Sequence, residues 1–245
     1  MQQPSIEQRI QRRFNKATVN YQLLTDGDHV LIALSGGKDS LLLTELMARR
    51  QRIHRPSIKV SAVHVRMQNI DYESDTQYLE NFCTERGIKL HVLTASFDAS
   101  TDPRHTPCVL CSRTRRNKII HLAQEIGCNK IALGHHQDDI LHTALMNLTF
   151  EGTFSTMPVR LELEKMPLTL IRPLALCTES DIRTYAEIHG YQKQNKRCTY
   201  EQQTKRSDIA NLFQQLEQLN SEARYSIWHA LEKANKLIEL KRINN

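Results

Sequence analysis

The sequence predicts an α/β protein with a doubly wound parallel sheet, followed by a mostly helical C-terminal extension. Short apolar segments rich in β-branched residues recur as far as residue 152, and longer segments with helical periodicity alternate with them. The strand-like segments lack the polar face that a half-exposed strand would carry. Strands of this kind, alternating with helices, are typical of a parallel sheet that is covered on both faces.

The elements of this sheet follow from local patterns in chain order. An amphipathic helix is predicted over residues 5–24, because apolar residues recur there at helical spacing. Each later strand leads into a helix, and Gly87 ends one of these helices. The predicted strands cover residues 29–35, 58–66, 89–96 and 130–136, and the predicted helices cover 38–51, 74–87, the later part of 108–127, and 138–150.

Beyond Gly152 the pattern changes. Two extended segments are predicted around a turn at residues 165–167, followed by a helix over 179–190 and two amphipathic helices over about 207–219 and 221–240. We therefore place a boundary near residue 152. The predicted parts are an N-terminal basic helix (1–24), an α/β domain (25–152) and a C-terminal extension (153–245).

Composition and charge narrow the class of protein. The chain has 245 residues and a formal net charge of +6, and no apolar run approaches the roughly 20 residues needed to cross a bilayer. Its first residues lack an apolar signal core, so we expect a cytoplasmic protein with no membrane partner. Six cysteines are too few for a disulfide scaffold in a chain of this length, and favour metal ligands or catalytic thiols.

Three basic clusters favour a nucleic acid partner, because basic residues gathered on one surface attract a polyanion. One lies on the first helix, one covers residues 113–118, and one lies within residues 193–206. A solvated basic face is the alternative for any single cluster, but two of the three flank candidate chemistry. The basic residues of the first helix are Arg9, Arg12, Arg13 and Lys16.

The segment SGGKDS (residues 35–40) ends a predicted strand and begins a helix, where ligands bind in open parallel sheets. A helix N-terminus suits an anion, and glycines let the backbone approach phosphate oxygens. A carboxylate beside a phosphate needs a cation between them, so Asp39 suggests Mg²⁺. Neither a Walker A loop nor a G-x-G-x-x-G motif is present. A tight turn alone would explain the glycines but not Ser35, Lys38, Asp39 and Ser40 together.

A second segment, GHHQDD (residues 134–139), lies at the end of another predicted strand. Gly134 permits close backbone approach, and Asp138 and Asp139 fall in the first helical turn. Alone, the aspartates could be helix caps. Beside a phosphate-binding loop they become candidate ligands for a metal or a nucleotide, and His135 could contact phosphate.

These residues resemble a known family. SGGKDS is similar to the SGGxDS signature of the PP-loop (N-type) ATP pyrophosphatases, which share an adenine nucleotide alpha-hydrolase-like fold, cleave ATP between its α and β phosphates and adenylate a substrate. CVLCSRTRR, GHHQDD, IRPLA and CTESDI resemble the tRNA 2-thiocytidine synthetases, which thiolate a cytidine of the tRNA anticodon loop. The resemblance covers most of the chain. It implies a tRNA cytidine 2-sulfurtransferase that uses ATP, Mg²⁺ and an iron–sulfur (4Fe-4S) cluster.

The cysteines are the candidate metal ligands. Cys108 and Cys111 form a C-x-x-C pair that could hold a metal or act as a redox dithiol, and no second such pair occurs. The resemblance implies Cys198 as the third cluster ligand, although Glu201 stands where relatives carry a further cysteine. Cys177 is the alternative third ligand, and His105 is a weaker one. Cys83 and Cys128 are predicted to be packed small side chains.

The resemblance implies the following roles. Transfer of AMP to the C2 oxygen of cytidine makes that oxygen a good leaving group, and a sulfur nucleophile then expels AMP. Arg172 would neutralise phosphate, or would be a surface arginine in an ion pair. The candidate catalytic residues are Lys38, Asp39 and Asp138. The candidate ATP-binding residues are Ala33, Ser35, Gly36, Gly37, Lys38, Asp39, Ser40, Val63, Val65, Gly134, His135, Asp139 and Arg172.

Other functions stay open at this point. A lysidine-synthetase-like ligase or an amidotransferase would use the same ATP loop, with the cysteines in a structural metal site. A nucleotide-binding sensor would carry out no chemistry. The expected partners are tRNA, a sulfur donor such as a cysteine desulfurase and, as a further possibility, a second copy in a homodimer.

Overall fold

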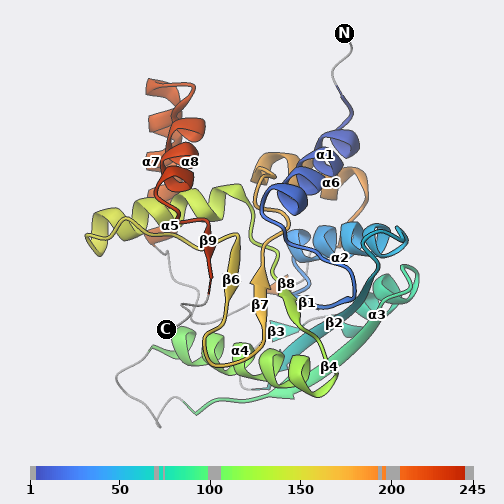
Figure 1. Cartoon of the computed structure of the whole chain (residues 1–245). Coiled ribbons are helices and arrows are strands. Elements are labelled where there is room, and N and C mark those ends of the chain that lie inside the picture. The colour runs from blue at the N-terminus through green and yellow to red at the C-terminus, as the bar shows by residue number, and fades with distance from the viewer. Residues whose placement is uncertain are drawn as a thin grey trace, which may run out of the picture.

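The computed structural model describes residues 4–68, 72–73, 75–98, 106–192, 195–196 and 205–240 (Figure 1). In this part of the chain one sheet has the order β4-β2-β1-β5-β7-β6-β9. Its first five strands pair in parallel, while β6 runs antiparallel to β7 and parallel to β9. The predicted α/β class is thereby confirmed. The strands are β1 (Asp28–Ala33), β2 (Ile58–Met67), β4 (Lys89–Ala95), β5 (Lys130–Ala132), β6 (Arg160–Glu162), β7 (Thr169–Ile171) and β9 (Ile238–Glu239), and β3 (Tyr72–Glu73) pairs separately with β8 (Asn195–Lys196).

Helices cover both faces of the sheet. Alternation along β1 divides its side chains between two cores, because Val30 and Ile32 face one side and Leu31 faces the other. The first core also holds side chains of α1, α2, α3 and α6, and the second is closed by α4. Figure 1 shows α4 beneath the sheet and α1, α2 and α6 above it. The helices are α1 (Ile6–Asn20), α2 (Lys38–Gln51), α3 (Thr76–Thr84), α4 (Pro107–Glu125), α5 (Gln137–Phe150), α6 (Glu179–Ile188), α7 (Lys205–Leu219) and α8 (Ala223–Lys233).

Local sequence explains where several helices begin. Ser5 starts α1 with a capping box, in which its side chain accepts from the Gln8 N–H and the Gln8 side chain accepts from the Ser5 N–H. Thr178 caps α6 by accepting from the Asp181 N–H. Helix α2 has the bounds that its sequence predicts. These caps supply partners for N–H groups that a helix start would otherwise leave unpaired.

Several boundaries differ from the prediction, since α1 ends at Asn20 and α3 at Thr84, and three further differences matter for the site or the sheet. Strand β5 ends at Ala132, so residues 133–136 form a loop. Helix α4 begins at Pro107, since proline is well suited to the first helical position, and the C-x-x-C pair is therefore helical throughout. The last predicted helix is wrong beyond Lys233, because Ile238–Glu239 pairs with β6 as a strand.

The chain after residue 152 takes part in the same sheet. Strands β6 and β7 extend it beyond β5, while α7 and α8 pack near α5. Figure 1 shows these two helices rising from α5. The predicted division into three parts stays a prediction.

Candidate functional site

The SGGKDS loop is braced by its own serines. Gly36 has φ +84°, a left-handed conformation that favours glycine, and Gly37 precedes the first residue of α2. The Ser40 hydroxyl donates to the Gly37 carbonyl at 2.9 Å, and the Ser35 hydroxyl donates to Ser40 Oγ at 3.1 Å. The loop is therefore held open at the N-terminus of α2, the geometry that suits an anion.

Lys38 and Asp39 lie at the mouth of this loop. Lys38 Nζ lies 3.2 Å from Asp39 Oδ1 and 3.5 Å from Glu179 Oε1. Asp39 Oδ1 is buried, yet it accepts no hydrogen bond from the described residues. A buried carboxylate oxygen without a hydrogen-bond donor is suited to a cation.

Gly134 joins the two motifs. A Cβ built on Gly134 would lie 3.1 Å from the backbone nitrogen of Ser40 and 3.2 Å from the carbonyl carbon of Asp39. Such distances are tighter than ordinary van der Waals contact. The glycine in GHHQDD therefore lets the loop after β5 pack on the first turn of α2, a reason that the sequence alone did not reveal.

His136 lies among three carboxylates. Its Nε2 is 3.5 Å from Asp139 Oδ2 and 3.9 Å from Asp39 Oδ1, and its Nδ1 is 3.6 Å from Asp138 Oδ2. Burial alone would lower the pKa of His136, but the carboxylates overcome this effect and raise it. The imidazolium form thus offsets the negative charge that gathers between the two motifs.

Asp138 is engaged within the protein. Its Oδ2 accepts from the Glu179 N–H at 2.7 Å, and its Oδ1 accepts from Arg224 Nη2 at 2.7 Å. Burial would raise the pKa of Asp138, but His136, Arg224 and the Glu179 N–H hold it far below its ordinary value. Sequence reasoning missed Arg224, because nothing near it in the chain marks it as a partner of this motif.

Arg172 and His135 form a buried pair. Arg172 is 6% exposed, so the alternative of a surface ion pair is wrong. Its Nε donates to His135 Nδ1 at 3.2 Å, and its Nη1 donates to the Pro158 carbonyl. Burial, followed by the charge of Arg172, lowers the pKa of His135 to about 4, so the histidine is neutral and accepts. Burial and Arg116 lower the pKa of Arg172 to about 10, which still leaves a cation at neutral pH.

A small cavity of about 70 Å³ opens beside the first loop. It places Ala33, at the end of β1, beside Val63 and Val65 within β2 and Ser35 of the loop, so these candidate residues lie together. Their role in binding ATP stays a prediction. His64 and Arg115 also line the cavity, and Arg115 was missed by sequence reasoning. The His64 Nδ1 contacts the Leu34 carbonyl at 2.8 Å, and a carbonyl only accepts, so Nδ1 carries the proton in this contact. The lining residues are Ala33, Leu34, Ser35, Val63, His64, Val65, Arg115 and Ile119.

The C-x-x-C pair lies in the first turns of α4. Cys108 is exposed and Cys111 is half-buried. Their spacing of three residues places both on one side of the helix. Cys111 precedes Arg115 by four residues, or about 6 Å of helix rise, so the pair lies near the cavity.

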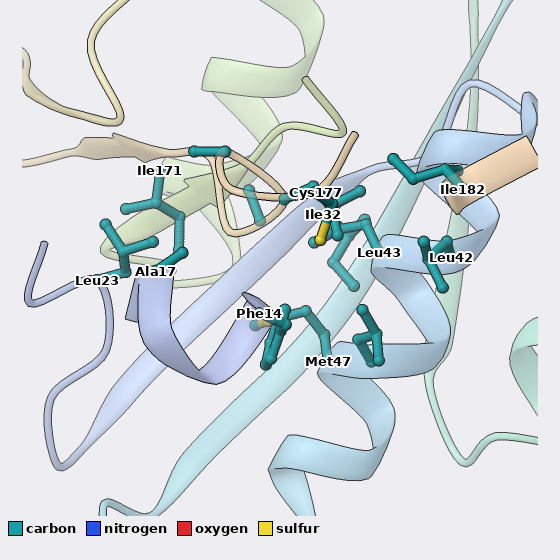
Figure 2. Close-up of a cluster of buried hydrophobic side chains, with 14 of the residues drawn as sticks. Phe14, Ala17, Leu23, Ile32, Leu42, Leu43, Met47, Ile171, Cys177 and Ile182 are labelled. Atoms are coloured by element: carbon teal, nitrogen blue, oxygen red, sulfur yellow. The ribbon is translucent and has the colours of Figure 1, made fainter. Parts of the chain in front are cut away.

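The other cysteines differ from the C-x-x-C pair, because those that the structure describes are buried. Cys177 is 0% exposed, and Figure 2 shows it in the core beside Ile32 and Leu43. Burial raises the pKa of its thiol to about 12, so the geometry argues against Cys177 as a cluster ligand. Cys83 and Cys128 are buried, as predicted. Cys198 and His105 lie outside the described residues, and in the described part no group of three His, Cys, Asp or Glu residues is placed to hold a metal.

Two cations of the predicted basic face on the first helix form ion pairs within the protein, and its role toward nucleic acid stays a prediction. Arg9 and Arg13 both pair with Asp181 of α6, at 2.9 Å and 2.5 Å. These two arginines dock α1 onto α6, while Arg12 and Lys16 are exposed. In the second cluster Arg113, Arg116 and Lys118 are exposed, and the third lies mostly outside the described residues. Among the described helices, none has both the length and the apolar character needed to cross a membrane.

Comparison with known proteins gives consistent results. A family model described as the PP-loop domain matches residues 6–209. The tRNA-cytidine(32) 2-sulfurtransferase of Methylococcus capsulatus is 38% identical over 191 residues, 76% of this chain and 65% of that protein. The protein of the same name from Pseudomonas putida strain F1 is 33% identical over 193 residues, 77% of this chain and 70% of that protein. The chain spans 65%, 62% and 65% of the length of three such relatives.

Solved structures share the fold. The U34-tRNA thiolase NcsA from Methanococcus maripaludis, with its [4Fe-4S] cluster, superposes with a TM-score of 0.77 at 24% identity, covering 96% of this chain and 81% of that one. The NMN synthetase of Francisella tularensis superposes with a TM-score of 0.57 at 16% identity, covering 98% and 100%. At such identities the likeness establishes the fold alone.

Proposed function

The chain belongs to the PP-loop domain family, together with the proteins named tRNA-cytidine(32) 2-sulfurtransferases, and on this premise we propose that it is an ATP-dependent tRNA cytidine 2-sulfurtransferase. The observation that carries the proposal is the course of α4. This helix presents Cys108 and Cys111 in its first turns and lines the cavity beside the SGGKDS loop with Arg115 and Ile119. One rigid element thus links candidate sulfur chemistry to the candidate nucleotide site.

ATP would bind where the two motifs meet. The N-terminus of α2 would receive phosphate oxygens, and Lys38 would lie beside them. Arg172 supports this assignment, because its buried guanidinium has no carboxylate within ion-pair distance among the described residues. A phosphate would supply the missing negative charge. The small apolar cavity at Ala33 and Val63 would receive part of the nucleoside.

Mg²⁺ would bind between the motifs. Asp39 fits this role, because its buried Oδ1 accepts no hydrogen bond from the described residues. Asp139 is the second candidate ligand, with a side chain that is 27% exposed. Mg²⁺ commonly takes one or two carboxylates and completes its shell with water and substrate phosphates. When bound, the ion would offset the charge of the departing pyrophosphate.

The cysteine pair would hold an iron–sulfur cluster. Thiolates are the soft ligands that such clusters require, and the exposed Cys108 and half-buried Cys111 lie together on α4. Cys198, the third ligand implied by the sequence resemblance, stays a prediction outside the described residues. The cluster, when bound, would supply or hold the sulfur that is transferred.

The chain's own residues would serve two bond exchanges on the substrate. The C2 oxygen of cytidine attacks the α-phosphorus of ATP, and the bond to pyrophosphate breaks while Lys38 and Arg172 offset the charge. Sulfur at the sulfide level then bonds to C2, and AMP leaves with the original oxygen. Exposed cations on α4, including Arg113 and Arg116, would contact the RNA backbone. A donor such as a cysteine desulfurase would replace the sulfur as a persulfide, and a thiol reductant would supply the two electrons that return it to the sulfide level.

The experiment that tests this proposal separates the cysteines. Cys108→Ser and Cys111→Ser should each lower bound iron and abolish thiolation measured by mass spectrometry of tRNA nucleosides, because a hydroxyl binds iron poorly. ATP binding should persist. Cys83→Ala is the matched control, since Cys83 is buried in the core on the other face of the sheet from Cys111.

Two results would contradict the proposal. Full thiolation by both serine variants under strict anaerobiosis would exclude a role for the pair in sulfur transfer. ATP-dependent ligation of an amino acid or an amide to tRNA, without any sulfur incorporation, would favour a ligase or amidotransferase instead. The absorption of iron–sulfur charge transfer in an anaerobic preparation gives an independent readout.

A further inference from the structure

Arg224 on α8 contacts two other helices, α5 and α7, at once. Its Nη2 donates to Asp138 Oδ1 at 2.7 Å and its Nη1 to Gln137 Oε1 at 3.2 Å, both on α5. Its Nε donates to Glu217 Oε1 on α7 at 2.8 Å, and its guanidinium lies 5.1 Å from the ring centre of Phe213. The Arg224 side chain is only 15% exposed, so these contacts are largely shielded from solvent.

Asp138 links Arg224 to the start of α6, which lies next to the SGGKDS loop. Its second oxygen accepts from the Glu179 N–H at the start of α6. The Glu179 carboxylate in turn lies 3.5 Å from Lys38 Nζ. Both oxygens of Asp138 are thus used within the protein, and they connect α8 to the start of α6 rather than facing a ligand.

Helix α7 is placed by its contacts with α5. The Phe213 ring of α7 packs edge-on against His142 of α5, with ring centres 5.3 Å apart. Arg206, an exposed cation, lies in the first turn of α7. The placement of α7 on α5 therefore decides where the cation at residue 206 stands.

Apolar packing attaches α7 and α8 to the rest of the protein, whereas the polar contacts of Arg224 set their orientation. The buried side chains of Ile209, Phe213 and Trp228 hold α7 and α8 on the rest of the protein. Such contacts are not directional. The hydrogen bonds of Arg224 are directional and charge-assisted, so they select one orientation of the two helices.

From these contacts we infer that Arg224 is a positioning residue, which acts through Asp138 and Glu217 to hold α7, with its exposed Arg206, in one orientation on α5. The inference rests on the proposed function, because the group that is positioned is a cation for tRNA. We call the contacts of Arg224 with Asp138 and Glu217 the Arg224 joint. Asp138, on this view, is part of this joint and does not contact the metal. Asp39 and Asp139 are then the two carboxylates that remain as candidate metal ligands.

A kinetic experiment tests whether the Arg224 joint positions α7. Arg224→Gln should raise the KM for tRNA about tenfold and leave the KM for ATP within about twofold, because the loop itself is not altered. Arg224→Lys should recover part of the loss, since a lysine keeps the charge but cannot make all three contacts. Lys233→Gln is the matched control, an exposed cation of the same helix whose loss should change neither constant. A fall in kcat alone, in step with the folded fraction, would overturn the inference.

Amide hydrogen exchange gives a readout that does not depend on thiolation. With a non-hydrolysable ATP analogue bound and no tRNA, residues 205–219 should exchange at least about tenfold faster in Arg224→Gln than in Lys233→Gln, while α5 stays protected. Unchanged exchange in α7 would overturn the inference. Should the unmodified protein fail to modify tRNA, the proposed function fails, and the exchange experiment still decides whether Arg224 positions α7.

Discussion

The two loops that meet at the ends of β1 and β5 contain similar residues but use them differently. In SGGKDS the side chains of Lys38 and Asp39 are 31% and 29% exposed, and Asp39 Oδ1 accepts no hydrogen bond from the described residues. In GHHQDD the His136 ring is buried among carboxylates, and both oxygens of Asp138 accept within the protein.

This difference shows that a carboxylate in a motif can serve a ligand or the fold. Asp39 and Asp138 both fall in the first turn of a helix after a parallel strand. Asp138 differs because α6 and α8 bring donors to it from far along the chain. The first loop therefore keeps a carboxylate oxygen without a hydrogen bond from the described residues, whereas Asp138 of the second loop holds the surrounding helices in place.

The largest expected effect comes from the first loop. Asp39→Asn should lower ATP-dependent pyrophosphate release about a thousandfold, because the amide loses the charge that would bind Mg²⁺. The midpoint of thermal unfolding should hardly change, since asparagine is tolerated near a helix start. Near-normal pyrophosphate release by this variant would remove Asp39 from the metal site.

In the second loop the expected effect is on stability. Asp138→Asn should lower the free energy of unfolding by about 3 kcal/mol, because it removes one of the two carboxylates that pair with the shielded Arg224 cation. Urea unfolding at neutral pH measures the loss. Glu187→Gln, an exposed change on α6, should cost less than about 0.5 kcal/mol.

The same variant has a defined pH dependence. The pKa of Asp138 is lowered in the folded protein, so its contribution is present above the ordinary value of 3.8 and is lost as the pH falls below it. The difference in stability between the unmodified protein and Asp138→Asn should therefore shrink in acid. A difference that grows in acid would show that the carboxylate does not act as an ion.

Gly134→Ala tests the contact between the loops. Its Cβ would meet the backbone at Asp39 and Ser40, so we expect a cost of about 2 kcal/mol and a higher KM for ATP. Gly190→Ala is the control, because Gly190 has φ +63° and open space around it. That substitution should cost about 1 kcal/mol through backbone strain and leave the KM for ATP unchanged. Equal KM values in both variants would mean that the Gly134 contact does not shape the loop.

The smallest expected effect belongs to His136. Its pKa is raised by the surrounding carboxylates, so it stabilises the fold fully below its ordinary value of 6.5 and loses this effect as the pH rises through the folded value. His136→Gln should therefore be most destabilising in mildly acidic solution and less so at alkaline pH. Denaturant unfolding at several pH values measures this trend, and a constant difference across the range would contradict it.

The local patterns of the sequence were sufficient for most of the sheet and for the position of the first loop. Alternation of apolar strands with helices predicted the parallel sheet, and the bounds of α2 agree with the prediction. The position of the SGGKDS loop between β1 and α2 was predicted correctly because its residues are neighbours in the chain. The start of α4 and the strand β9 were not, since a helix start in a polar segment and a two-residue edge strand leave little periodicity to detect.

What the sequence determined by itself was the position of its motifs at the ends of strands, because that follows from the order of short-range patterns. Only the tertiary structure decided what each polar side chain meets. Arg9 pairs with Asp181 across 172 positions and Arg224 with Asp138 across 86, and no local pattern encodes either pair. Ion pairs form between groups that folding brings within a few ångströms, whatever their separation along the chain. The roles of Asp138 and of the first helix's arginines therefore emerged only when the helices were packed.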